Sequence, residues 1–420
     1  MKNRLTELYG KDSTQKLLAS LISILIGLAV GAVVIIVVGL LKNTIGIKGV
    51  WDGVRLIFFG IFSTGREAGK LTWGYNSQSL GNMLFRAMPL VMTGLSVALA
   101  NKTGLFNIGA PGQYLMGTMA TLMIALGIPA GTLPAWLIWL LAFLGGMVAG
   151  AIWGAIPGAL KAFLNINEVL ACIMTNWVAA NVVTWAFDAS NFKNMVEGTK
   201  TGYVYKTTYG LTQVDGAWTY VEGLGVSTPK MGLNLLFPNS QVNGGILIAA
   251  LMAVGVYILM NKTTLGYELK ACGSNRHAAR YAGINDKRNI VLSMAIAGAL
   301  SAAGAALYWL SGNTEFYWNT SQALPAIGFN GIPVALLAVN NPIAVIFSAI
   351  FMAMLNIVGN TLSGLTAYNE YITDVIIAVI VYLSAFSLVV RMWLAGRKKK
   401  VEAAAETAPV DTAKEGGEGA

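Results

Sequence analysis

The chain has 420 residues and a formal net charge of +9; 55% of its residues are hydrophobic and only 11% are charged. A soluble globular protein carries roughly 25% charged residues, so this composition excludes an ordinary soluble enzyme. Residues 103–160 and 316–369 contain no Asp, Glu, Lys, Arg or His over 58 and 54 residues respectively, and segments of that length lie in lipid or in protein surrounded by it. The sequence therefore predicts an all-α, polytopic transmembrane helical bundle.

Apolar segments recur along nearly the whole chain and set the number of expected membrane spans. A helix needs about 20 apolar residues to cross roughly 30 Å of hydrocarbon. This measure predicts about ten spans, at residues 17–41, 82–100, 108–127, 134–158, 169–187, 244–260, 290–310, 323–339, 342–360 and 371–390. The eighth contains Pro325, Gly328, Gly331 and Pro333, which indicates a broken or re-entrant segment.

Lysine and arginine content indicates which ends and loops face the cytoplasm. The N-terminal arm, residues 1–16, and the flank that follows the last span are both basic, so both termini are expected inside. Loop 261–289 then lies in the cytoplasm with a net charge of +4, and loop 188–243 lies outside with a net charge of 0. The transmembrane domain is expected over 17–392, followed by a disordered cytoplasmic tail over 393–420.

Segment 42–80 disagrees with this orientation, because it would lie outside with five basic residues against two acidic ones. It contains the semi-apolar stretch 50–62, which we interpret as a helix lying along the membrane interface. Orientation by charge is a bias rather than a law, so we keep the count of ten spans.

The histidine and cysteine content removes most catalytic and metal-binding possibilities. His277 is the single histidine, so there is no cluster for a metal site and, unless it were itself the base, no imidazole to activate a nucleophile. Cys172 and Cys272 lie 100 residues apart and supply no disulfide framework. We expect no catalytic residue, no metal ligand and no enzyme activity. The basic excess belongs to loops, since no nucleic-acid motif accompanies it.

Carboxamide and aromatic side chains, rather than charges, are the polar content of the predicted spans. An uncharged solute with a flat ring, such as a nucleoside, is bound by amide hydrogen bonds and aromatic stacking. The candidate residues of a substrate path are Asn107, Gln113, Asn176, Trp177, Asn181, Asn330 and Asn356. The alternative interpretation is that these amides hydrogen-bond between helices and that the tryptophans mark the membrane interfaces.

Loop 261–289 is the most informative polar stretch, because it is compact, basic and contains a short predicted helix. Ser274 can cap that helix, residues 275–281 can form it and Gly283 can end it. Helical spacing brings His277, Ala278 and Tyr281 to one side, which suits the docking of a partner. The candidate docking residues are Ser274, Asn275, His277, Ala278, Ala279, Arg280, Tyr281 and Gly283. A loop whose cations only set orientation is the alternative.

The sequence shows no site that would supply energy for moving a solute along such a path. It has no Gly-x-x-x-x-Gly-Lys-Ser/Thr phosphate loop, so energy must come from a partner or from an ion gradient. Secondary transporters bury ionisable residues at mid-membrane, whereas Arg86 and Asp374 lie only a turn inside their predicted spans. An ion-coupled secondary transporter of small polar solutes remains the alternative function.

Four ordered stretches resemble the permease subunits of ATP-binding cassette (ABC) importers for simple sugars and nucleosides, a family that includes branched-chain amino-acid permeases. They are Asn-Ile-Gly-Ala-Pro-Gly-Gln at 107–113, Asn-Glu-Val at 167–169 with Ile-Met-Thr-Asn at 173–176, the loop motif at 266–284, and Gly-Phe-Asn-Gly-Ile-Pro-Val-Ala-Leu-Leu at 328–337 with Asn-Pro at 341–342. The likeness covers roughly 81–390. Pro111 stands where Glu is usual, Cys172 where Thr is common, and Asn330 where Asp is common.

The resemblance implies a permease subunit in the cell membrane of a bacterium. Such a subunit pairs with an identical or sister permease, receives its solute from an extracellular substrate-binding protein, and docks a cytoplasmic ATPase through the region from Ser274 to Gly283. ATP and magnesium are then expected on that ATPase, and no cofactor in this chain. The solute suggested first is a nucleoside, and a simple sugar is the close second.

Overall fold

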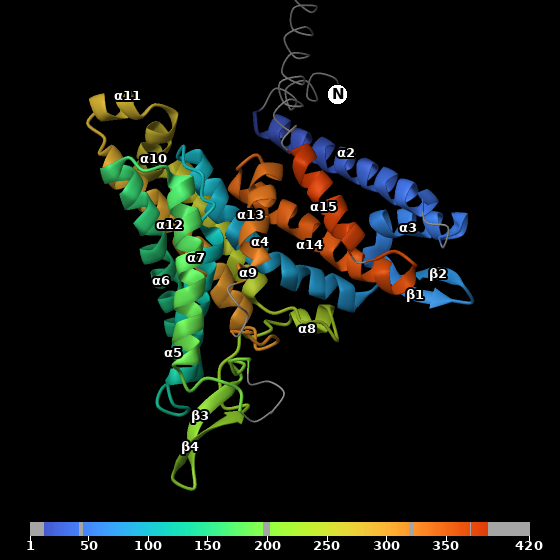
Figure 1. The fold of residues 1–420 in the computed structure, drawn as a ribbon, viewed down its shortest axis with the longest axis horizontal. Coiled ribbons are helices and arrows are strands. Elements are labelled where there is room, and N and C mark those ends of the chain that lie inside the picture. The colour runs from blue at the N-terminus through green and yellow to red at the C-terminus, as the bar shows by residue number, and fades with distance from the viewer. Residues whose placement is uncertain (1–11, 42–44, 196–201, 319–322, 370, 385–420) are drawn as a thin grey trace, which may run out of the picture.

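The computed structural model describes residues 12–41, 45–195, 202–318, 323–369 and 371–384 (Figure 1). The predicted disordered tail, most of the N-terminal arm and the sidedness of both termini lie outside these residues. The helices are α2 (Asp12–Leu41), α3 (Ile47–Phe59), α4 (Ser77–Lys102), α5 (Ala110–Gly127), α6 (Ala135–Leu164), α7 (Glu168–Asp188), α8 (Leu233–Leu236), α9 (Gly245–Lys262), α10 (Thr264–Ser274), α11 (Arg276–Tyr281), α12 (Asp286–Trp309), α13 (Ala326–Leu337), α14 (Pro342–Leu365) and α15 (Tyr371–Ser384).

Six described helices, α4, α6, α7, α9, α12 and α14, are long and apolar enough to cross a membrane. Each of the ten segments predicted as a span falls on a helix. The four remaining segments fall on α2, α5, α13 and α15. Among these, Leu25–Leu41 of α2 and Ala326–Leu337, which is α13, are apolar but shorter than 18 residues. The protein is therefore a mostly helical, multi-pass bundle, and the count of ten stays a prediction.

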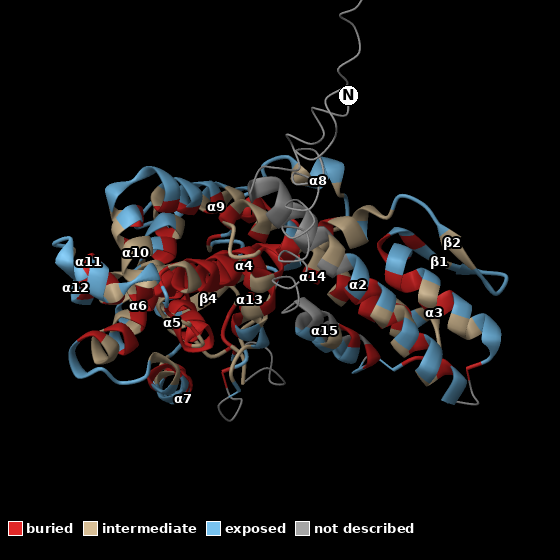
Figure 2. Ribbon diagram, turned by 90° about the horizontal axis from the view of Figure 1, so that it is seen from above, coloured by how far each residue is buried: buried red, intermediate tan, exposed pale blue. Residues whose placement is uncertain are grey.

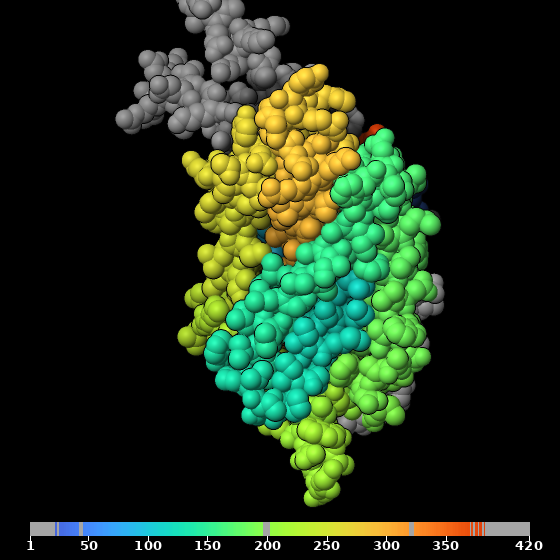
Figure 3. Space-filling model, turned by 90° about the vertical axis from the view of Figure 1, so that its left-hand side faces the viewer, coloured from blue at the N-terminus to red at the C-terminus, as the bar shows by residue number. Residues whose placement is uncertain are grey.

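Helices α4 and α12 form the centre of the bundle. Their most apolar windows are 83% and 72% buried, whereas that of α6 is only 28% buried (Figure 2). Small residues let α12 approach α6 closely, since a Cβ atom added to Gly298 would lie 2.1 Å from the backbone oxygen of Gly150. Figure 3 shows the outer side of this packing, where α6 and α7 cover much of one face and α5 is visible between them.

Helices α2, α3 and α15 form a unit at one side of the bundle (Figure 2). The hydroxyl of Tyr368, just before α15, donates a hydrogen bond of 2.8 Å to the backbone oxygen of Ile35 on α2. Helix α3 buries Leu56 and Ile57 and exposes Ile47 and Phe59, and it covers most of the stretch 50–62 that was expected to be helical. Its position along a membrane interface stays a prediction.

The all-α prediction was incomplete, because two antiparallel hairpins interrupt the helices. Strands β1 (Ser63–Glu67) and β2 (Lys70–Trp73) form one, and strands β3 (Tyr209–Val214) and β4 (Ala217–Glu222) form the other. The second turns at Asp215 and Gly216, whose φ angles are +52° and +82°. Asp-Gly favours this two-residue hairpin turn, because both positions need a positive φ.

The two loops that the charge pattern assigned to opposite sides lie at opposite ends of the bundle. The β3–β4 hairpin of loop 188–243 extends from one end, and α10 and α11 of loop 261–289 extend from the other (Figure 1). An outside location of loop 188–243 and a cytoplasmic location of loop 261–289 require this arrangement.

Candidate translocation and coupling sites

The connection between α4 and α5 folds back into the bundle instead of staying at its end. The side-chain amide of Asn107 donates a hydrogen bond of 3.0 Å to the hydroxyl of Ser96, and both residues are fully buried. Ser96 lies six positions before Lys102, the last residue of α4, so Asn107 contacts α4 about 9 Å back from the end of the helix. Residues 103–109 therefore form a re-entrant turn, which we call the buried turn.

Side-chain amides supply the hydrogen bonds that this non-helical backbone needs. The side chains of Asn107 and Gln113 bind each other through two amide hydrogen bonds of 2.8 and 3.1 Å. The side-chain oxygen of Asn107 also accepts from the backbone N–H of Gly109 at 3.1 Å. Irregular backbone at membrane depth is tolerated only where protein satisfies it. The Asn-Ile-Gly-Ala-Pro-Gly-Gln motif thus encodes a buried turn together with its own amide partners.

Asn176 on α7 completes the same network from another part of the chain. Its side-chain carbonyl accepts from the backbone N–H of Gly112 at 2.9 Å, and its amide donates to the backbone oxygen of Ile108 at 3.0 Å. Asn107, Gln113 and Asn176 are 0%, 1% and 2% exposed. The structure uses these three amides to hold the buried turn, and direct contact with a solute stays a prediction for them.

The other four candidate path residues lie apart from this network. Trp177 and Asn181 lie on the exposed face of α7, where the Asn181 amide donates to the Trp177 backbone oxygen at 2.8 Å. Asn330 is half-buried on α13, and Asn356 is half-buried on α14 with its amide bound to the backbone oxygen of Met352 at 3.0 Å. The described contacts therefore do not gather all seven residues into one site.

Helix α13 is a half-length helix that meets the buried turn. Its 12 residues extend about 18 Å, well short of the roughly 30 Å of a hydrocarbon core. A Cβ atom added to Gly328 would lie 2.5 Å from Cα of Pro111 in the first turn of α5. At the other end, the Asn101 amide of α4 donates to the Asn340 side-chain oxygen at 3.0 Å. The Pro- and Gly-rich pattern that indicated a broken span thus corresponds to a short helix.

Pro111 fits its position although it departs from the family pattern. It occupies the first turn of α5, where its missing N–H would have had no partner within the helix. Its ring and backbone pack against Gly328. The substitution of proline for the usual glutamate is therefore compatible with both the helix start and the contact with α13.

The predicted short helix of loop 261–289 is α11, but its cap is not Ser274. Ser274 is the last residue of α10, and the Asn275 side chain caps α11 by accepting from the Ala278 backbone N–H at 3.0 Å. Asn275 is the one residue between the two helices and has an extended backbone (φ −154°, ψ 103°), which is the conformation of an N-cap. Both residues are good caps, and backbone conformation decides between them.

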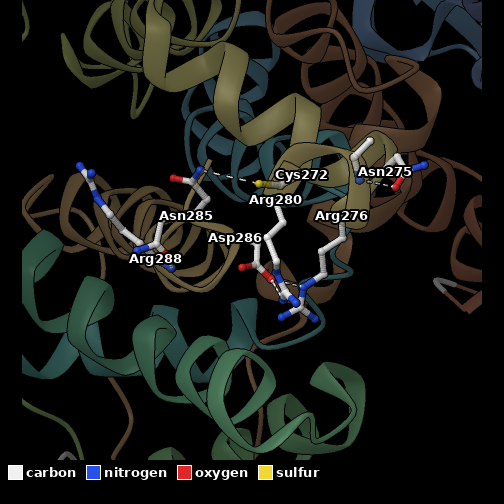
Figure 4. Close-up of polar contacts among 9 residues, drawn as sticks. Cys272, Asn275, Arg276, Arg280, Asn285, Asp286 and Arg288 are labelled. Atoms are coloured by element: carbon white, nitrogen blue, oxygen red, sulfur yellow. Dashed lines mark hydrogen bonds and ion pairs between the residues drawn. The ribbon is translucent and has the colours of Figure 1, made fainter. Parts of the chain in front are cut away.

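Asp286 fastens α11 to the start of α12. Its Oδ2 atom accepts hydrogen bonds from Nε of Arg276 at 2.6 Å and from Nη2 of Arg280 at 2.7 Å (Figure 4). The hydrogen bond from Arg280, followed by that from Arg276, holds the pKa of the Asp286 carboxyl well below its usual range. Asn289 joins α10 to the same unit by donating to Oε2 of Glu268 at 3.1 Å. We call this assembly of α10, α11 and the first turn of α12 the knob.

The knob presents the predicted docking face to solvent. His277, Ala278 and Tyr281 are all exposed, and Tyr281 is 96% exposed. Ala279 is buried, and Gly283 has a φ of +80°, so these two predicted docking residues shape the knob and bulky substitutions there would distort it. Docking of a partner on the exposed face stays a prediction.

The knob also contacts the buried turn, a relationship that the sequence did not reveal. A Cβ atom added to Gly273 at the end of α10 would lie 2.5 Å from the carbonyl carbon of Thr103 and 2.7 Å from the nitrogen of Gly104. The hydroxyl of Thr103 is in turn hydrogen-bonded to that of Ser293 on α12. The end of α10 and the entrance of the buried turn are therefore in direct backbone contact.

Comparisons with known proteins agree with this architecture. Residues 79–385 match the family described as branched-chain amino acid transport system / permease component. The match covers well over half of the chain, and the chain belongs to this family. It is therefore a multi-pass permease component of the cell membrane. No solved structure matches the chain significantly.

Two curated relatives resemble nearly the full chain, and a third resembles about three quarters of it. The nucleoside ABC transporter permease protein NupB of Lactococcus lactis subsp. cremoris is 32% identical over 385 residues, which are 91% of this chain and 94% of the relative. The guanosine ABC transporter permease protein NupP of Bacillus subtilis is 32% identical over 384 residues, 91% of this chain and 97% of the relative. A glucose ABC transporter permease protein of Haloferax volcanii is 29% identical over 302 residues, 72% and 74% of the two chains.

Proposed function

We propose that this chain is the membrane-spanning permease subunit of an ABC importer and forms the translocation path for a nucleoside. The observation that carries the proposal is the contact of Gly273 in the knob with Thr103 and Gly104 at the entrance of the buried turn. An ATPase that pulls or rotates the knob would act directly on a non-helical segment inside the bundle. Such a segment can change conformation without breaking a helix.

The proposed assembly supplies the ATP-binding site, the second half of the path and the delivery of the solute. A cytoplasmic ABC ATPase would dock on His277, Ala278 and Tyr281 and would carry ATP and magnesium. A second permease, identical or a sister, would complete the path, and an extracellular binding protein would deliver the solute to the end that carries the β3–β4 hairpin. We also propose ten spans with both termini in the cytoplasm, which is the topology that the loop charges favour.

Ion coupling receives no support from the described interior. Among the described residues, the buried acidic or basic side chains are Asp52 and Asp286. Asp52 binds Nη2 of Arg66 at 2.6 Å beside the β1–β2 hairpin, and Asp286 binds two arginines in the knob. Both carboxylates are thus paired outside the middle of a long apolar helix: Asp286 is the first residue of α12, and Asp52 lies on α3, which is not among the helices long enough to cross a membrane. Proton and sodium relays place such groups at mid-membrane.

A nucleoside is the preferred solute because two relatives of nearly full-length similarity are named for nucleoside or guanosine transport. A simple sugar is the second candidate, since a more distant relative is named for glucose. The test is uptake of radiolabelled guanosine by cells that express the complete transporter, with unlabelled nucleosides and sugars as competitors. We expect competition by nucleosides only. Competition by glucose alone would replace the proposed substrate with a sugar.

A further inference from the structure

Helix α3 and the short 3-10 turn that follows it expose one continuous face at the edge of the molecule (Figure 2). Helical spacing brings together on this side six exposed residues, which we call the α3 face: Ile47, Lys48, Trp51, Arg55, Phe59 and Phe62. The opposite side of α3 buries Leu56 and Ile57. Exposed apolar surface of this kind marks a contact with a membrane or with another protein.

Both acidic residues near the α3 face lie beside other cations. Residues 45–80 contain four basic residues and two acidic ones. The Asp52 carboxylate is buried on the other side of α3 and binds Nη2 of Arg66 at 2.6 Å. Glu67 lies opposite Lys70 in the register of the β1–β2 hairpin. The other two cations of this region have neither carboxylate as a partner.

Lys48 and Arg55 are these two cations. They are seven residues, or about two turns, apart and therefore lie on the same side of the helix. The Arg55 guanidinium lies over the ring of Trp51, 5.2 Å from its centroid, and has no hydrogen bond or ion pair with another described residue. The Lys48 ammonium donates one hydrogen bond of 2.9 Å to the backbone oxygen of Gly69 and keeps two further donors. The α3 face therefore combines apolar side chains with two cations that can bind an anion.

The hairpin after α3 lies at the end of the bundle that carries loop 188–243. The Tyr75 hydroxyl, just after β2, donates a hydrogen bond to the backbone oxygen of Leu236 on α8. Tyr75 and Trp73 are exposed there, as aromatic residues commonly are at a membrane–water interface. Helix α3 has 13 residues, about 20 Å, and is too short to cross roughly 30 Å of hydrocarbon. Its exposed face is thus placed to meet the membrane surface.

We infer that the α3 face binds an anionic phospholipid, with Arg55 and Lys48 at the phosphate and the apolar side chains among the upper parts of the acyl chains. Helices that expose both apolar and basic residues lie in the membrane interface and favour anionic lipids. A guanidinium matches the geometry of a phosphate, and the Trp51 ring beneath Arg55 holds it in place. The basic excess of segment 42–80, which opposes the general orientation bias, then has a local role.

A second copy of the chain is a less suitable partner for this face. Two identical α3 faces in a symmetric contact would bring Lys48 and Arg55 of one chain against the same cations of the other. Burying such charges without acidic partners is costly. A lipid phosphate supplies the missing negative charge, and the acyl chains cover the exposed rings of Trp51 and Phe59.

Quenching by spin-labelled lipids tests the assignment without any measurement of transport. The full chain with Cys272→Ser carries a bimane fluorophore on Phe59→Cys and is reconstituted in vesicles, while Cys172 is buried and stays unlabelled. Phosphatidylglycerol and phosphatidylcholine with the same spin label are added in turn at the same small fraction. We expect phosphatidylglycerol to be enriched about fivefold at this site, the effect of one cation at an anionic surface. Phe62→Cys serves as the reporter should Phe59→Cys fail to assemble.

Matched variants assign the preference to the cations. Arg55→Gln keeps a polar side chain but removes its charge, and should lower the enrichment of phosphatidylglycerol about fivefold. Arg288→Gln changes an exposed arginine in the knob, at the opposite end of the bundle, and should leave the enrichment unchanged. A reporter at Leu251→Cys, on the exposed apolar side of α9, should be quenched equally by the two lipids.

The contrary results have distinct meanings. Equal quenching by the two lipids at Phe59→Cys would indicate ordinary membrane contact only and would overturn the assignment. An enrichment that persists when Arg55→Gln and Lys48→Gln are combined would also overturn it, because the cations would not be its source. Absent quenching together with cross-linking of two chains through Phe59→Cys would replace the lipid with a second copy. None of these outcomes depends on which solute the chain transports.

Discussion

The side-chain carbonyl of Asn176, in the middle of α7, accepts a hydrogen bond of 2.9 Å from the backbone N–H of Gly112 in the first turn of α5. A Cβ atom added to Gly112 would lie 2.7 Å from that same carbonyl oxygen, so only glycine allows the contact without rearrangement. Together the two residues anchor the buried turn to α7. The turn is therefore held by specific hydrogen bonds, which can be removed one at a time.

Asn176→Ala should destabilise the protein by about 2–4 kcal/mol, because it leaves two buried backbone groups, the Gly112 N–H and the Ile108 oxygen, without partners. The midpoint of thermal unfolding of the detergent-purified protein measures this loss. Asn181→Ala, on the exposed face of the same helix, is the control and should shift the midpoint little. Equal stability of the two variants would mean that Asn176 does not hold the turn.

Glycine substitutions at two helices should change stability in opposite directions. Gly298→Ala forces a Cβ atom against the Gly150 backbone and should cost about 1–3 kcal/mol or more. Gly255 lies on α9 with no other atom within 4 Å of an added Cβ, so Gly255→Ala should stabilise the helix by up to about 1 kcal/mol. Thermal unfolding of both variants in the same detergent checks the signs. A stable Gly298→Ala protein would contradict the close packing of α6 and α12.

Tyr281→Ala should weaken the binding of the ATPase without unfolding the knob. The Tyr281 side chain is 96% exposed, and an aromatic residue so placed is a candidate hot spot, worth about tenfold or more in affinity. Co-purification of the ATPase with the tagged permease measures the effect, and Arg288→Ala, exposed at the start of α12, serves as the control. Undiminished binding by Tyr281→Ala would argue against docking on this face.

Asp286→Asn should loosen the knob itself. The change weakens two charge-assisted hydrogen bonds, to Arg276 and Arg280, that fasten α11 to α12. We expect faster hydrogen exchange in α11, with little change in α6 and α9, and a lower rate of ATP-driven uptake. Unchanged exchange in α11 would show that its position depends on other contacts.

The two ends of the bundle should react with impermeant thiol reagents from opposite sides of the membrane. Trp218→Cys in β4 is expected to react in intact cells, and Tyr281→Cys in α11 only after the membrane is opened. The native Cys272 is replaced by Ser in this experiment, because it lies in the knob beside Asn289. Labelling of Tyr281→Cys in intact cells would reverse the proposed orientation.

Much of the fold could be predicted from local pattern. Long apolar runs predicted the helices, and the Pro- and Gly-rich segment predicted the interruption that is the short α13. The charge of loops 188–243 and 261–289 predicted that they lie at opposite ends of the bundle. The Asp215-Gly216 dipeptide also favours a hairpin turn, although the expectation from the sequence was only that it belongs to loop 188–243. Ser274 and Asn275 are neighbouring residues with similar capping ability, so the backbone alone distinguished them.

The contacts that matter for the site were not predictable in this way, because they join distant positions. Asn176 reaches Gly112 across 64 residues, and Gly273 meets Gly104 across more than twice that distance in the chain. A buried Asn in a span has the same local pattern whether it binds a solute or a backbone N–H.

The most direct test of the account is uptake by proteoliposomes of defined composition. Vesicles that contain this chain, its permease partner and its ATPase, with the binding protein outside and ATP inside, should accumulate guanosine. Accumulation should stop when ATP is replaced by ADP or when the ATPase is omitted, and should persist when proton and sodium gradients are dissipated. Accumulation by this chain alone, driven by an ion gradient, would contradict the account.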